Sequence, residues 1–79
     1  MKLTAELSLY PFKDDYKPII KSFIAAVREH GDLEIISNAM STQICGDFDH
    51  VFAVVRQELK ASYREHGRQV LWSSLFPGT

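Results

Sequence analysis

The chain has 79 residues, of which 46% are hydrophobic and 24% charged, with a formal net charge of −1 and a single cysteine. This composition is typical of one globular domain, here residues 1–79, and excludes a chain that is disordered throughout. One cysteine excludes an intramolecular disulfide framework, so self-association is a reasonable way to stabilise such a small core. The balance of 9 basic against 10 acidic residues argues against nucleic acid as the main partner.

The N-terminal residues lack the features of a targeting segment. Glu6 interrupts the apolar residues there, which argues against a signal-peptide core. All apolar runs are far shorter than the ~20 residues that cross a bilayer. We therefore expect a cytoplasmic protein with no membrane partner, in which the lone Cys45 stays reduced.

Residues 3–10 alternate strictly between two kinds of side chain, which predicts a strand with one apolar face. Pro11 is expected to end this strand because proline cannot donate a hydrogen bond to a sheet. The side chains on the less apolar face are Thr4, Glu6, Ser8 and Tyr10.

A helix is predicted next. Asp14 and Asp15 supply potential N-cap oxygens, Pro18 suits the first turn, and Gly31 suits the position just after the helix. The apolar side chains at helical spacing are Tyr16, Ile19, Ile20, Phe23, Ile24 and Val27.

Two short strands are predicted at residues 33–38 and 41–46, with only Ala39 and Met40 between them, so a tight or bulged hairpin is expected. A second helix, capped by Asp47 or Asp49, then runs to Gly67, and a last strand covers residues 69–76. The apolar positions expected on this helix are Val51, Phe52, Val55, Leu59 and Tyr63.

The predicted order is strand-helix-strand followed by strand-helix-strand. Residues 28–31 recur as residues 64–67, in both cases Arg-Glu-His-Gly at the end of a helix, which supports two equivalent halves. Two such halves with right-handed crossovers form a ferredoxin-like α+β fold. We therefore expect a four-stranded antiparallel sheet with both helices on one face.

The other face of that sheet is expected to be bare in a monomer. The last strand is apolar or aromatic on both faces, Trp72 included, which predicts burial against another subunit in a dimer or tetramer. Polar side chains of the first strand are then either pocket residues near the subunit boundary or simply residues suited to an exposed strand. The sequence favours these two interpretations equally.

No catalytic or metal-binding pattern is present in the sequence. His30, His50 and His66 are scattered, with the first and last at helix ends where solvent exposure is the simplest interpretation, and Cys45 has no CxxC partner. We expect no metal, no catalytic residue and no enzyme activity. The alternative hypothesis is that the protein is an enzyme, in which Glu6, Tyr10 or His50 would act as acid or base. RNA binding is disfavoured because residues 41–45 hold neither an aromatic nor a basic side chain.

The hairpin at residues 38–43 concentrates an amide and two hydroxyl groups in Asn38, Ser41 and Thr42. Such residues favour turns and strands for local reasons alone. Met40 and Ile44 suggest partial burial, however, and buried polar groups need hydrogen-bond partners. A small planar heterocycle with donors and acceptors of its own would supply them.

Several short segments, taken in their order and spacing, resemble the thiamine/hydroxymethylpyrimidine-binding proteins. They are residues 8–11 (Ser-Leu-Tyr-Pro), residues 38–42 (Asn-Ala-Met-Ser-Thr), Gly46, and residues 50–52 (His-Val-Phe). The resemblance spans nearly the whole chain. It implies a ferredoxin-like domain that binds thiamine or its pyrimidine half without catalysis and assembles through its sheets.

The chemistry of an aminopyrimidine, which has one amino donor and two ring-nitrogen acceptors, is compatible with the polar residues of this chain. No cofactor is expected besides this ligand. The alternative is a regulatory or assembly domain that oligomerises through its open sheet face and binds no small ligand. The predicted ligand-binding residues are Ser8, Tyr10, Asn38, Ser41, Thr42, Glu6 and Trp72.

Overall fold

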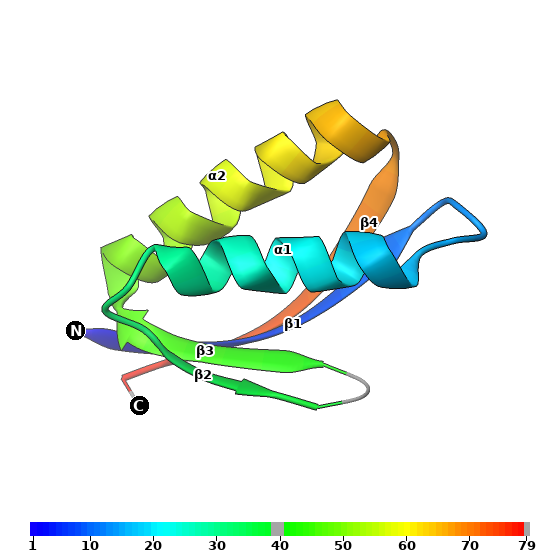
Figure 1. Cartoon of the computed structure of the whole chain (residues 1–79). Helices are drawn as coiled ribbons and strands as arrows, with labels where there is room; N and C mark the ends of the chain where they lie inside the picture. The colour runs from blue at the N-terminus through cyan, green and yellow to red at the C-terminus, as the bar shows by residue number, and fades with distance from the viewer. Residues whose placement is uncertain (39–40, 79) are drawn as a thin grey trace.

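A computed structural model describes residues 1–38 and 41–78, and it confirms the predicted α+β ferredoxin-like fold (Figure 1). The four strands form one antiparallel sheet in the order β2-β3-β1-β4. The elements in chain order are β1 (Lys2–Pro11), α1 (Lys17–Glu29), β2 (Glu34–Ser37), β3 (Thr42–Asp47), α2 (Phe48–His66) and β4 (Gln69–Pro77).

Both helices cover one face of the sheet, and the hydrophobic core lies between the two layers (Figure 1). The alternation of β1 is confirmed, since its odd-numbered apolar residues are buried and its even-numbered residues are not. The buried apolar residues are Leu3, Ala5, Leu7, Leu9, Ile19, Phe23, Val27, Ile44, Val51 and Val54.

The start of α1 differs from the sequence prediction. The N-cap residue is Tyr16, which makes no capping hydrogen bond through its side chain, and Asp14 and Asp15 are exposed in the preceding loop. Pro18 stands at the first helical positions, where a missing N–H costs no intrahelical hydrogen bond. Gly31 follows the helix with φ of 74°, as predicted for the residue after a helix.

The cap of α2 is as predicted, because the side chain of Asp47 accepts a hydrogen bond from the backbone N–H of His50 at 3.3 Å. The predicted buried stripe is partly wrong. Phe52 and Tyr63 are 42% and 58% exposed. The positions with lowest exposure on this helix are Val51, Val54 and Ser62. The helix is therefore rotated about its axis relative to the stripe that apolarity alone suggested.

The histidine at the end of α1 also departs from expectation. His30 is half-buried, and its Nε2 atom lies 2.6 Å from Oε2 of Glu58 on α2. This contact ties the two helices together. His50 donates from Nε2 to the carbonyl oxygen of Gly31 at 2.9 Å, which joins the start of α2 to the end of α1.

The strands β2 and β3 pair with each other as predicted. The pairing of β3 with β1 covers only the first part of β1. The β1–β3 ladder ends at the pair Leu7–Thr42, whereas the β1–β4 ladder continues to Pro11–Gln69. Among the described residues, the last four residues of β1 therefore pair with β4 alone. The predicted turn at Ala39 and Met40 lies outside the described residues.

No helix in the described part of the chain is both long enough and apolar enough to pass through a bilayer.

Candidate functional site

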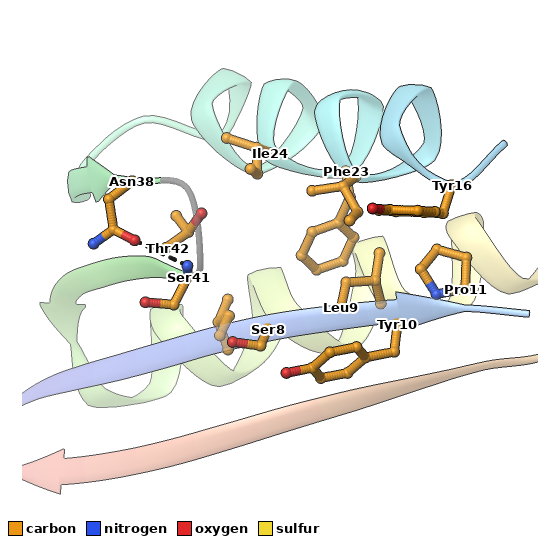
Figure 2. A pocket seen from close by; sticks show the side chains of 12 residues that line it. Ser8, Leu9, Tyr10, Pro11, Tyr16, Phe23, Ile24, Asn38, Ser41 and Thr42 are labelled. Atoms are coloured by element: carbon orange, nitrogen blue, oxygen red, sulfur yellow. Dashed lines mark hydrogen bonds between the residues drawn. The ribbon is translucent and has the colours of Figure 1, made fainter. Parts of the chain in front are cut away.

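A cavity of about 370 Å³ lies between the second half of β1, the first half of α1 and the described hairpin residues Asn38, Ser41 and Thr42 (Figure 2). Three elements form its walls: the second half of β1, the first half of α1 and the end of the hairpin. The described lining residues are Leu7, Ser8, Leu9, Tyr10, Pro11, Tyr16, Ile20, Phe23, Ile24, Asn38, Ser41 and Thr42.

The exposed edge of β1 directs main-chain groups toward the cavity. Phe12 donates from its backbone N–H to the carbonyl oxygen of Arg68 at 3.1 Å, so residues of even number in β1 point their main-chain groups at β4. Leu9, of odd number, directs its N–H and C=O to the opposite side, just past the last β1–β3 pair.

The hairpin contributes a group of neutral polar side chains. The Oδ1 atom of Asn38 accepts a hydrogen bond from the backbone N–H of Ser41 at 3.0 Å, which orients the amide (Figure 2). The hydroxyl groups of Ser37 and Thr42 lie 3.1 Å apart, and Thr42 is buried. These local hydrogen bonds hold the polar end of the cavity in a defined arrangement.

The carboxylate of Glu6, which lies on the open face of β1, contacts this polar end. Its Oε2 atom accepts from Ser41 Oγ and from Gln43 Nε2, both at 3.5 Å. None of the described lining residues is a lysine or an arginine. The electrostatic environment of the cavity is thus neutral to negative, which suits a neutral or cationic ligand better than an anion.

Five of the seven residues that the sequence singled out line this cavity: Ser8, Tyr10, Asn38, Ser41 and Thr42. Glu6 is one hydrogen bond away from it. Trp72 does not line it. This side chain is 66% exposed on the open sheet face, where it stands directly opposite Ser8 in the β1–β4 register. For all seven residues, a role in binding a ligand stays a prediction.

Sequence reasoning missed the contribution of α1. Phe23 and Ile24 of this helix, and Tyr16 at its N-cap, project over β1 and form the apolar wall of the cavity (Figure 2). The only signal in the sequence was the width of the apolar stripe, which includes Ile20 and Ile24 beside the three residues that bury most fully. An apolar stripe wider than the hydrophobic core requires is consistent with a helix that also lines a cavity.

No cluster of histidine, cysteine, aspartate or glutamate side chains suited to a metal ion occurs within residues 1–38 and 41–78.

The fold and the cavity define a small ferredoxin-like domain with a mostly apolar cavity at one end of its sheet. The model of the YKOF-related family matches residues 2–75, so the chain belongs to this family. No protein with a curated description matches the chain.

Solved structures share the fold at low sequence identity. A Streptococcus pneumoniae protein is 17% identical with a TM-score of 0.87, over 100% of this chain and 89% of that one. A Methanocaldococcus jannascii hypothetical protein is 22% identical with a TM-score of 0.86, over 99% and 81%. A Thermotoga maritima protein, described as a "putative thiamine biosynthesis/salvage protein", is 18% identical with a TM-score of 0.85, over 95% and 82%.

Proposed function

We propose that the cavity binds thiamine or its hydroxymethylpyrimidine moiety, and that the protein serves transport, salvage or buffering of this ligand in the cytoplasm without catalysis. The observation that carries the proposal is the cavity of about 370 Å³ that joins an apolar and aromatic wall to a row of neutral hydrogen-bonding groups. Ligand pockets of about 300–1,000 Å³ commonly have this composition. The description of the Thermotoga maritima neighbour is consistent with it.

The polar edge of the cavity matches the donors and acceptors of an aminopyrimidine. The hydroxyl groups of Ser8 and Thr42 and the amide of Asn38 line the cavity and suit the ring nitrogens and the amino group of such a ring. Tyr16 and Phe23 offer aromatic surface to its faces.

The carboxylate of Glu6 gives the site a preference for the whole vitamin over its pyrimidine half. Thiamine carries a permanent positive charge on its thiazolium ring, and Glu6 is held beside the polar end of the cavity by Ser41. A carboxylate close to a bound cation attracts it even when both are partly solvated. The neutral hydroxymethylpyrimidine lacks this electrostatic attraction.

Calorimetry tests the proposal. The wild-type protein is titrated with thiamine and with hydroxymethylpyrimidine, and the titrations are repeated with Thr42→Val and Ser41→Ala. Loss of one hydrogen bond of about 1 kcal/mol weakens binding about fivefold. The control is Ser22→Ala, because Ser22 is an exposed hydroxyl on α1 that does not line this cavity. Absence of heat from both ligands at millimolar concentration would refute the proposal.

A second candidate function is a regulatory or assembly domain that binds no small ligand. It is favoured by the open sheet face, where Ile36 and Trp72 are 65% and 66% exposed. Under this function thiamine leaves the melting temperature unchanged. Trp72→Ser then lowers the mass of the oligomer. The double variant Ser41→Ala with Thr42→Ala changes no thiamine-dependent shift in melting temperature, because the wild-type protein shows no such shift.

A further inference from the structure

A groove lies between the last turns of α2 and the start of β4, two elements that follow one another in the chain (Figure 1). Its volume is about 530 Å³, which is ample for a small molecule. Leu59, Tyr63 and Leu71 form its apolar part, and the exposed Lys60 and Arg64 stand at its rim. The groove is separate from the cavity beside β1, because the two share no lining residue.

The charged side chains of this half of α2 lie on two different sides of the helix. Glu58 and Glu65 line a small hollow between α1 and α2, where Glu58 contacts His30 at 2.6 Å. Lys60 and Arg64 line the groove beside β4 instead. None of the described lining residues of the groove is acidic. The groove therefore presents an apolar surface with a positive rim, which favours an anion.

The helix dipole does not account for the position of Lys60. Basic residues commonly occupy the last turn of a helix, where they interact with the negative end of its dipole. This explains Arg64 and His66, which are the basic residues in the last turn of α2. Lys60 lies before that turn. Within residues 1–38 and 41–78, neither Lys60 nor Arg64 forms an ion pair with a carboxylate. Both cations are therefore available to an external anion.

The polar side chain in the groove is already engaged. Ser62 Oγ donates to Oε1 of Gln69 at 3.0 Å, and Nε2 of Gln69 donates to the carbonyl oxygen of Gly67 at 3.1 Å. A polar head group is thus left to the two cations. Residues 59–64 extend over about 8 Å of the helix axis, since each residue adds about 1.5 Å. That length suits a short alkyl chain or a ring system.

We propose that this groove binds a small amphipathic anion, in which an acidic head group contacts Lys60 and Arg64 and an apolar body covers the rest of the groove. The cavity beside β1 has the opposite character, because none of its described lining residues is basic and the carboxylate of Glu6 contacts its polar end. One small domain thus holds two sites with opposite charge preferences. This second site does not depend on the thiamine proposal.

Calorimetry with two probes of equal chain length tests the charge preference. Octanoate and octylammonium are titrated into the full chain at concentrations below those at which they form micelles. We expect octanoate to bind, and octylammonium to bind at least about tenfold more weakly, because the rim attracts one head group and repels the other.

A double variant tests the two cations. Lys60→Gln with Arg64→Gln should weaken octanoate binding at least about tenfold, because two solvated charge pairs are lost. Lys21→Gln with Arg28→Gln is the matched control, since it removes the same charge at exposed positions of α1 that line neither the groove nor the cavity beside β1. Its octanoate binding should equal that of the wild-type protein.

Two further measurements fix the location and the source of the anion. Octanoate should move the amide NMR signals of Tyr63 and Leu71, and excess thiamine should not displace it. Vesicles of phosphatidylglycerol should not sediment the protein, because the groove is sized for a free molecule. Absence of octanoate heat, as expected if a second copy fills the groove, overturns the proposal. It is equally overturned by equal binding of the two probes, by unaltered octanoate binding in the Lys60 and Arg64 variant, by displacement with thiamine, or by binding to vesicles alone.

Discussion

The hydroxyl group of Ser41 donates a hydrogen bond to the carboxylate of Glu6 at 3.5 Å, across 35 residues of sequence. Glu6 belongs to the middle of β1, and Ser41 stands just before β3. This contact joins the open sheet face to the polar end of the cavity. The carboxylate of Glu6 is thereby held by the same residue that helps to form the cavity.

Glu6→Gln should weaken the binding of thiamine and leave the binding of hydroxymethylpyrimidine unchanged. The amide keeps an acceptor for Ser41 and Gln43 but removes the negative charge. We expect thiamine to bind about fivefold more weakly, because a solvated charge pair at about 4 Å is worth about 1 kcal/mol. Hydroxymethylpyrimidine, which is neutral, should bind as before in calorimetry. Glu65→Gln is the control, and an equal loss for both ligands contradicts the assigned role.

Phosphorylation of the ligand should weaken binding. No described lining residue of the cavity is a lysine or an arginine, and the carboxylate of Glu6 would repel a phosphate. Thiamine diphosphate is therefore expected to bind at least about tenfold more weakly than thiamine, with a difference that shrinks as salt screens the repulsion. Competition calorimetry at low and high salt measures both effects. Equal affinities would show that the charge argument is wrong.

Gly46→Ala should destabilise the fold. A Cβ atom added at Gly46 would lie 2.8 Å from Cδ2 of Leu33 and 3.0 Å from the backbone oxygen of Asp32. Overpacking of this kind costs about 1–3 kcal/mol in the free energy of unfolding. Urea denaturation measures it, with Cys45→Ala as the control at the adjacent, less crowded position. No change in the unfolding midpoint would mean that the loop before β2 yields at little cost.

The two acidic residues proposed as helix caps should differ in their effect on stability. Asp47→Ala removes the side chain that accepts from the N–H of His50, and we expect a loss of about 1 kcal/mol. Asp14→Ala should cost close to nothing, because Asp14 is exposed and does not cap α1. Thermal unfolding of both variants checks the difference. Equal losses would indicate that the loop before α1 contributes to stability in another way.

Local patterns in the sequence were enough to predict the fold. The alternation in residues 3–10 corresponds to β1, and the glycines at 31 and 67 correspond to the ends of α1 and α2. These features depend on backbone geometry and on neighbours a few residues away, so they can be read without knowing the tertiary structure. The order of elements then leaves few topologies, and the ferredoxin-like one is correct.

Details that depend on the rotation of a helix were beyond such patterns. Phe52 and Tyr63 fit an apolar stripe on α2, yet both are exposed, while Ser62 is buried and donates to Gln69 Oε1 at 3.0 Å. A polar residue with a well-placed partner can occupy the buried side of a helix. That partner comes from β4, so its presence is not visible from the helix sequence.

By itself, the sequence determined the strands, the helices, their order and five polar residues that share one cavity, because each of these follows from side-chain type and short-range spacing. Only the tertiary structure decided that the cavity exists. It depends on the ladder between β1 and β3 ending at Leu7 and Thr42 while β1 continues, and on α1 placing Phe23 above that gap. Strand register and helix placement are set by packing between distant segments, which no local pattern specifies.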